Sequence, residues 1–196
     1  MTQVLPALPR NVEYDISEVS NTRGMTPPLG GPTTQIDRPG TRHAIRVSVP
    51  AIAAKGCGPA LLAQLAQGRT EHTTIAIPEP TVPVLSYGSV VVSGAGQTGR
   101  TLNVSGLTPG VTVPAGKWLS FEIGGQTFAY FTRAAVTGAG GVTGLPVYPT
   151  IRRSPASGAT VALAAPRMGG FVTGALERTV RRIGALGFSF TITERE

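Results

Sequence analysis

Hydrophobic and polar residues alternate along much of the chain, in short runs that end at glycine or proline. Alternation with a period of two is typical of a β-strand that buries one face. The densest series lies between Val90 and Arg167, where one hairpin pattern follows another. Such a series predicts a small antiparallel barrel or sandwich.

The segment from Lys117 to Phe131 carries the clearest hairpin pattern. Its first half alternates Leu119, Phe121 and Ile123 with Trp118, Ser120 and Glu122. Gly124 and Gly125 come next, and the alternation resumes at Phe128 and Tyr130. Two consecutive glycines supply the positive φ angles of a tight two-residue turn, so we predict a β-hairpin here.

A different pattern, between residues 41 and 85, predicts a strand, a helix and a second strand. The strands are the alternating run HAIRVSVPAI and the run TTIAI. Gly58 and Pro59 lead into the helix, since proline is tolerated in the first helical turn. Leucines give the helix one apolar face, and Gly68 is its predicted end. With about ten residues, such a helix is too short to be stable without packing.

The two ends of the chain differ in pattern. Within residues 1–40, a short alternating strand around Tyr14 precedes a stretch rich in proline and glycine that cannot keep regular structure for long. We expect this stretch to be an extended arm that lies on a neighbouring subunit. Near the other end, residues 186–193 form a clean alternating strand. Residues 175–184 fit a helix or a strand, and we favour a strand.

The composition is unusual in its charge. Charged residues are only 14% of the 196, against roughly 25% in an ordinary soluble domain. The net charge is +7, and nearly all the cations are arginines. Arginine suits interfaces and nucleic acid alike, although a GC-rich genome explains the excess of arginine, alanine, glycine and proline as well. The arginines are spread out and lack the clustering and stacking aromatics of a nucleic-acid binder.

Residues able to carry chemistry are few and scattered. Cys57 is the single cysteine, so no intrachain disulfide can form, and a buried or interface thiol is the expected role. The histidines, His43 and His72, have no neighbouring acid that suggests a triad. The sequence GAGQTG lacks the Lys-Ser/Thr ending of a phosphate loop and is better explained as a turn. The carboxylates in strand-like patterns are Glu122, Glu177 and Glu194. We therefore expect no enzyme, no cofactor and no metal site.

The sequence also bears on targeting. The start MTQVLPALPR lacks the charged beginning and continuous apolar run of a signal peptide. No stretch approaches ~20 uninterrupted apolar residues. We expect a chain made in the cytoplasm that stays soluble and does not insert into a membrane.

Taken in order, these pieces resemble the distal tail (Dit-like) proteins of long-tailed bacteriophages, which form a ring joining the tail tube to the baseplate or fibre. The matching elements are the strand RVSVPAI, the helix PALLAQLAQGRT, the connector PEPTVPVLSYG, the stretch Val92 to Leu102, the hairpin AGKWLSFEIGGQTFAY, the turn Pro149 to Arg152 and the strand FSFTITE. The resemblance covers residues 41–196 and rests on order and spacing.

The resemblance implies a mainly β fold in three parts. Residues 41–85 and 168–196 would form a β-sandwich belt domain, similar to that of a tail tube and with one short helix. Residues 86–167 would form a small antiparallel β-barrel inserted into it, and residues 1–40 the extended arm. The final strand would return to pair with the belt's first strand. Such an insertion is acceptable because loop-closure cost grows slowly with length.

In function, the resemblance implies a non-enzymatic structural component of the virion, assembled in the bacterial cytoplasm. Copies would form a hexameric or pseudo-hexameric ring around a channel. Its partners would be other copies of itself, the tail tube protein above, and hub, baseplate or fibre proteins below; DNA would only pass through. The candidate inter-subunit contacts are Trp118, Arg152, Arg153, Arg181 and Arg182.

Two alternatives stay open. A receptor- or carbohydrate-binding β-module of the tail tip is one, because Trp118, Tyr130 and Tyr148 could stack on sugars. Another tail or neck ring, such as a terminator, is the second, because similar folds recur across different functions.

Overall fold

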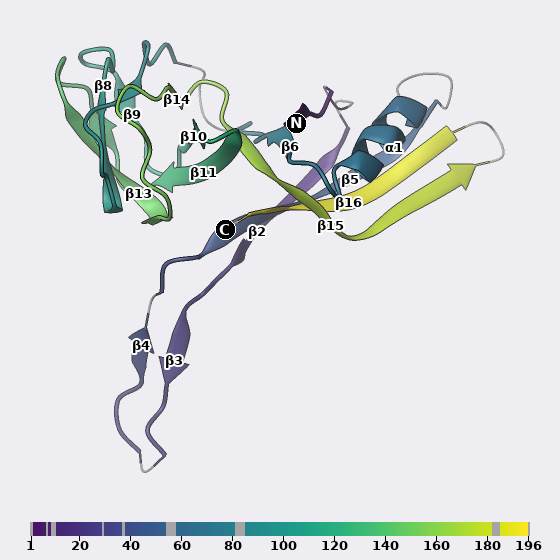
Figure 1. The fold of residues 1–196 in the computed structure, drawn as a ribbon, viewed down its shortest axis with the longest axis horizontal. Coiled ribbons are helices and arrows are strands. Elements are labelled where there is room, and N and C mark those ends of the chain that lie inside the picture. Colours follow the sequence, from purple (N-terminus) through teal and green to yellow (C-terminus); the bar gives the residue numbers. More distant parts are fainter. Residues whose placement is uncertain are drawn as a thin grey trace.

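The computed structural model describes residues 2–6, 8, 11–28, 30–36, 38–53, 58–80, 85–181 and 185–195. These residues form a mainly β structure with a single short helix and an almost closed, six-stranded antiparallel barrel, as the sequence predicts. Figure 1 shows the barrel at one end, a long strand hairpin at the other, and a thin arm that points away from both. Cys57 lies outside the described residues.

The first sheet contains six strands in the order β1-β6-β15-β16-β5-β2. In chain order these are β1 (Gln3–Val4), β2 (Glu13–Val19), β5 (Arg42–Ala53), β6 (Thr73–Ala76), β15 (Arg167–Arg181) and β16 (Ala185–Glu194). All neighbours are antiparallel except the short pair β1 and β6. The final strand therefore returns to pair with β5, as expected. The described part of the ambiguous segment, residues 175–181, belongs to strand β15.

Helix α1 (Gly58–Gln67) packs on one face of this sheet. Leu61 and Leu65, one helical turn apart, are buried against it. Burial of each contributes about 1.5–3 kcal/mol. Gly68 follows the last helical residue, and a larger side chain would not fit there because a Cβ would lie 2.6 Å from the Thr73 hydroxyl and 2.8 Å from a Val172 methyl. The facing strands contribute the buried residues Ile45, Val47, Val49, Phe188, Phe190 and Ile192.

The second sheet is the barrel, in the order β14-β10-β11-β13-β8-β7. Its strands are β7 (Val91–Val92), β8 (Gly99–Ser105), β10 (Trp118–Ile123), β11 (Gln126–Thr132), β13 (Thr143–Ile151) and β14 (Val161–Ala162). Backbone hydrogen bonds between residues 90–92 and 158–161 nearly close it. A short ribbon of β9 (Thr112–Val113) and β12 (Val136–Thr137) adds to it. The barrel has its own core, including Leu102, Leu119, Phe128, Tyr130 and Leu145.

The predicted hairpin between Lys117 and Phe131 is present as β10 and β11. Trp118 pairs with Phe131 and Ile123 with Gln126. Gly124 and Gly125 have φ angles of 57° and 75°, which confirms the predicted turn.

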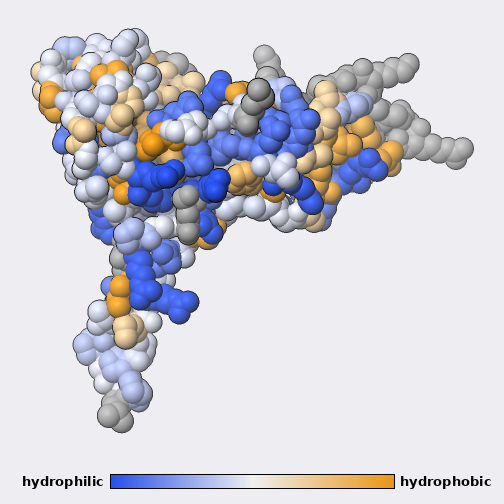
Figure 2. Space-filling view, viewed as in Figure 1, coloured by the Kyte–Doolittle hydropathy of each residue, from blue (hydrophilic) through white to orange (hydrophobic). Residues whose placement is uncertain are grey.

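The arm is more ordered than the sequence predicts. After β2, the chain forms β3 (Arg23–Met25), which pairs with β4 (Thr34–Ile36) before entering β5. The arm is thus a two-stranded continuation of the β2–β5 pair, and its tip holds the prolines and glycines. In the space-filling view it is a narrow extension from the body (Figure 2). The sequence missed this pairing because each strand has only three residues, too few for an alternation to be recognised.

Candidate assembly surfaces and the sheet–barrel junction

A buried polar cluster around Glu194, near the end of β16, joins the first sheet to the barrel. One oxygen (Oε2) of its carboxylate accepts hydrogen bonds from Arg152 Nη2 at 2.8 Å and from the His43 backbone N–H at 2.9 Å. The other (Oε1) accepts one from the Ala129 backbone N–H at 2.8 Å. The side chains of Arg152 and Glu194 are 5% and 1% exposed. Because Ala129 and Arg152 belong to the barrel and His43 to β5, one carboxylate connects both units.

Charge in this cluster is set by burial and by the ion pair. Burial raises the pKa of Glu194, while Arg152 and the two backbone N–H groups oppose that rise. Burial alone would lower the pKa of Arg152, but the carboxylate of Glu194 outweighs it and raises that pKa. The guanidinium also lies 5.4 and 5.5 Å from the ring centroids of Phe128 and Tyr130. Arg152 therefore stays charged inside the fold.

His43 lies beside this cluster and is 3% exposed. Its ring packs edge-on against Trp118, with 4.8 Å between centroids. Burial and the charge of Arg152 lower the pKa of His43 from 6.5 to about 4. His43 is thus neutral at pH 7 and fills space in the junction.

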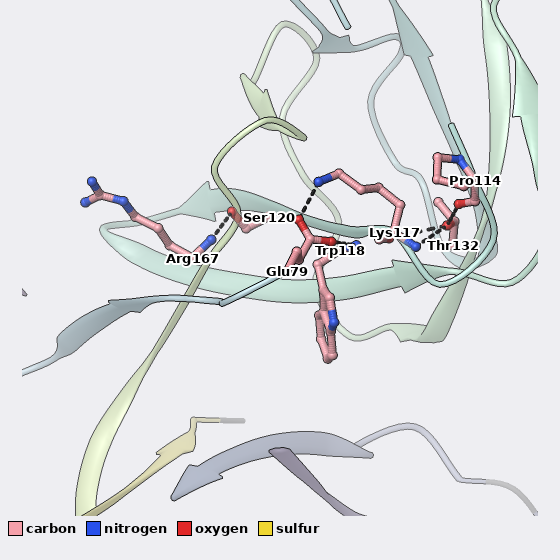
Figure 3. A network of polar contacts seen from close by, with 7 residues as sticks. All are labelled: Glu79, Pro114, Lys117, Trp118, Ser120, Thr132 and Arg167. Atoms are coloured by element: carbon pink, nitrogen blue, oxygen red, sulfur yellow. Dashed lines mark hydrogen bonds and ion pairs between the residues drawn. The ribbon is translucent and has the colours of Figure 1, made fainter. Parts of the chain in front are cut away.

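A second polar network fixes the points where the chain enters and leaves the barrel (Figure 3). On entry, Glu79 accepts a hydrogen bond from the Trp118 backbone N–H at 2.8 Å, and its other oxygen pairs with Lys117. The Lys117 and Glu79 side chains are 4% and 9% exposed. On exit, the Arg167 backbone N–H donates to the Ser120 hydroxyl at 2.9 Å. Both the segment that enters the barrel and the segment that leaves it are therefore hydrogen-bonded to β10.

Glu79 and Glu194 were not predicted from the sequence as junction residues, although one signal pointed to Glu194. Glu194 continues the alternation of Phe188, Phe190 and Ile192, so an acid occupies a position of the apolar face. A charge in such a position must be paired when it is buried.

Two residues predicted as inter-subunit contacts, Arg152 and Trp118, lie in the junction between the first sheet and the barrel. Because Arg152 is buried and paired within the chain, its assignment as an inter-subunit contact is wrong. Trp118 is half-buried between His43 and Phe131. The ring centroids of Trp118 and Phe131 are 5.4 Å apart. These two contacts account for the position of the Trp118 side chain, and its contact with a neighbouring subunit stays a prediction.

Two of the other three predicted contacts have a described backbone, Arg153 after β13 of the barrel and Arg181 in the first sheet. Arg153 is exposed and donates to Gln126 Oε1 at 3.3 Å. Arg181 is the last residue of β15, and its side chain lies outside the described residues, as does all of Arg182. Of the predicted arginines, Arg152 and Arg153 have described side chains, the first buried and the second exposed.

The aromatic residues considered for sugar stacking do not share an open surface. Tyr130 is 0% exposed and belongs to the barrel core. Tyr148 is half-buried and donates its hydroxyl hydrogen to Glu18 at 2.5 Å. The suggestion that Tyr130 stacks on a sugar is wrong, because its ring is not accessible.

The GAGQTG segment is a turn, as the sequence indicates. Its Gln97 side chain closes the turn by donating to the backbone carbonyls of Ser93 at 2.7 Å and Asn103 at 3.0 Å. The Gln97 amide oxygen accepts from the Asn103 N–H at 2.6 Å. Strand β8 follows, whereas a phosphate loop would lead into a helix.

Other chemistry-bearing groups are dispersed. Within the described ranges, no three His, Cys, Asp or Glu side chains come close enough to hold a metal ion. The one helix in that part of the chain, α1, has ten residues and is too short to cross a bilayer. Glu122 and Glu177 are exposed on different sheets.

The first sheet has two open edges. Strand β2 is at the end of the sheet, and no other described strand pairs with its outer side. Strand β15 pairs with β6 only from Arg167 to Gly170, and loop contacts extend to Gly174. Beyond Gly174, no described residue makes a backbone hydrogen bond to that side of β15. Open strand edges are ready to pair with another chain.

The two faces of the first sheet differ in chemistry. One is covered by α1 and the apolar core. The other carries hydroxyl side chains, namely Ser48, Thr173, Thr179, Ser189, Thr191 and Thr193, together with the exposed charged residues Glu13 and Glu177. Asp15 and Arg46 lie opposite each other on this second face, the hydroxyl face.

No family model matches the chain, and no curated protein matches it either.

Proposed function

We propose that the chain is a structural protein of a bacteriophage virion, a distal tail ring protein. It joins the tail tube to the tail tip or baseplate by oligomerising around the DNA channel. The observation that carries this proposal is the first sheet, with an open edge at β2 and another along the distal half of β15. Two different edges that meet head to tail generate a ring when the rotation closes.

The faces of this sheet suit the inside and outside of a ring. The helix-covered face is the outer one, and the hydroxyl face lines the channel. Neutral hydroxyls bind phosphate weakly compared with a row of arginines, whose contacts to DNA are strong at low salt. DNA in this arrangement passes through the channel and is not held there.

The barrel and the arm supply contacts beyond the ring. Figure 1 shows them leaving the first sheet in different directions. A two-stranded hairpin has marginal stability alone in water, and Met25 on the arm is 60% exposed. We assign the arm and barrel to contacts with other copies, with the tail tube above, and with hub, baseplate or fibre proteins below. The role is structural, requires no cofactor or membrane insertion, and places the protein in the virion.

Purification of the chain followed by light scattering and negative-stain microscopy tests this function. The expected result is a ring of uniform size with a central hole. Gold labelling of a tagged copy in virions should mark the distal end of the tail. A monomer at high concentration and unlabelled particles would contradict the proposal, and label at the neck would favour a terminator ring.

A further inference from the structure

The strands at the two open edges of the first sheet run in directions that allow antiparallel pairing between copies. Three antiparallel pairings separate β15 from β2, so the two strands run in opposite directions. If rotation about a ring axis continues the sheet from one copy to the next, β15 of the next copy lies antiparallel to β2. Antiparallel strands join through well-aligned backbone hydrogen bonds.

Each edge also exposes a large apolar residue on the same face. Ile16 on β2 is 37% exposed, and Val180 on β15 is 63% exposed. Ile16 pairs with buried Ile45, and Val180 pairs with Leu186, which packs with the helix-side core. Both side chains therefore belong to the helix-covered face, where a continued sheet would bring them together.

Setting Ile16 opposite Val180 fixes the rest of the antiparallel register. Two residues further, Glu18 falls opposite Arg178, and both side chains are exposed on that same face. Glu18 Oε1 also accepts the hydrogen bond from Tyr148, and its other carboxylate oxygen would face the arginine. Opposite charges in directly facing positions stabilise an antiparallel pair. In the same register, strand position 15, an aspartate, falls opposite position 181, an arginine.

A hollow on β2 provides space for the incoming strand. It has a volume of about 620 Å³ and is lined mainly by Val12, Tyr14, Ile16, Pro78 and Pro80. The β2 residues among these are on the helix-covered face, which is the face that would receive Val180 of the next copy.

We propose that β2 of one copy pairs antiparallel with residues 176–181 of β15 in the next copy, with Ile16 opposite Val180 and Glu18 opposite Arg178. This inference rests on the proposed ring and names the strands that close it. The occupant of the hollow on β2 is then a second copy of this chain, seated through Val180.

Cysteine pairing tests the register directly. In a Cys57→Ala background, Ile16→Cys combined with Val180→Cys places two thiols opposite each other, with Cβ atoms about 4.5–5.5 Å apart. Within one chain, the two sites are separated by three strand spacings of about 4.8 Å, too far for a disulfide. Oxidation of the assembled protein with oxidised glutathione should give a ladder of covalent multimers on non-reducing gels.

The controls separate this inference from the ring itself. Ile16→Cys with Thr179→Cys places the second thiol on the other face and should give no ladder, and neither should either single variant. Rings that form without a ladder in the Ile16–Val180 variant would overturn the register and leave the ring proposal standing. Parent protein that forms no ring would overturn both. Dimers from Ile16→Cys alone would show a symmetric β2–β2 contact and also overturn the inference.

Charge exchange gives a second readout. Glu18→Arg and Arg178→Glu should each weaken ring assembly, because like charges then face each other. Mixing the two variants should restore rings, since each supplies the edge that the other needs. The matched controls Glu122→Arg and Arg133→Glu alter exposed barrel residues and should assemble normally. Normal assembly of both single edge variants, with the folded state verified by circular dichroism, would contradict the pairing.

Discussion

At the residue scale, Glu194 connects the barrel to the first sheet through a single buried carboxylate. Its carboxylate receives three hydrogen bonds from the barrel and the first sheet. The sequence suggested that Arg152 faces a partner, but the structure pairs it with Glu194. Replacement of Arg152 should therefore impair folding of the single chain before it affects assembly.

Glu194→Gln should destabilise the protein by about 3 kcal/mol, because the Arg152 charge would remain buried without its counter-ion. Urea unfolding followed by fluorescence measures this. Glu122→Gln, at an exposed position, is the matched control and should change the free energy of unfolding by less than about 0.5 kcal/mol. The double variant Glu194→Leu with Arg152→Met should recover most of the loss. A single-variant effect no larger than the control would contradict the role of this pair.

His43 should make stability fall in mild acid. Its pKa is 6.5 in the unfolded chain and about 4 in the fold. Between these values the unfolded state binds more protons, so the contribution is complete above pH 6.5 and decreases as the pH falls towards 4. The difference between pH 7 and pH 5 should be about 2 kcal/mol, from about 1.4 kcal/mol per pKa unit.

Comparison with His43→Gln isolates this effect in urea unfolding at both pH values. Burial raises the pKa of Glu194 above 4.5, which gives a contribution of the opposite sign: it is present at low pH and lost as the pH rises. That contribution is common to both proteins, so the difference between them reports on His43. Equal pH dependence in the two proteins would show that the imidazole titrates normally.

At the element scale, the β10–β11 turn depends on backbone conformation alone. Gly124 has φ 57°, and a Cβ there would meet no atom within 4 Å. Gly124→Val should therefore cost about 1 kcal/mol or more through the left-handed backbone, without a steric clash. Thermal unfolding measures the loss. Gly141→Val is the control, because Gly141 has equal space and no positive φ, and equal melting temperatures would contradict the explanation.

The elements that the sequence predicts well are those with a local cause. Alternation identified the final strand, the glycine pair identified the turn, and the leucines with Gly58 and Gly68 identified the helix. The pairing of β3 with β4 and the contacts of Glu79 and Glu194 depend on residues far apart in the chain. The Glu194 carboxylate, for example, meets Arg152 from 42 positions away, and no local pattern encodes that distance.

At the scale of the whole molecule, the fold separates a sheet with open edges from a barrel that is nearly closed. The edge strands of the barrel are nearly paired with each other, whereas the first sheet has two edges that are open to pairing with another chain. The junction holds the two units through buried ion pairs at Glu194 and Glu79. In the proposed ring, copies joined through the first sheet would therefore hold their barrels at a fixed orientation. The boundaries proposed for the three parts of the chain stay predictions.

The hydroxyl face of the first sheet can be tested as the lining of the channel. If this face lines the channel, Ser189→Arg adds one positive charge per copy to the lumen, next to Ser48 on the neighbouring strand. Rings should still assemble, but DNA release from virions should be slower, most of all at low salt, because each phosphate contact releases counter-ions. Timed DNA release at two salt concentrations measures this. Thr101→Arg, exposed on the barrel, adds the same charge away from the channel and should not slow release. Equal release by both variants would place the hydroxyl face outside the channel.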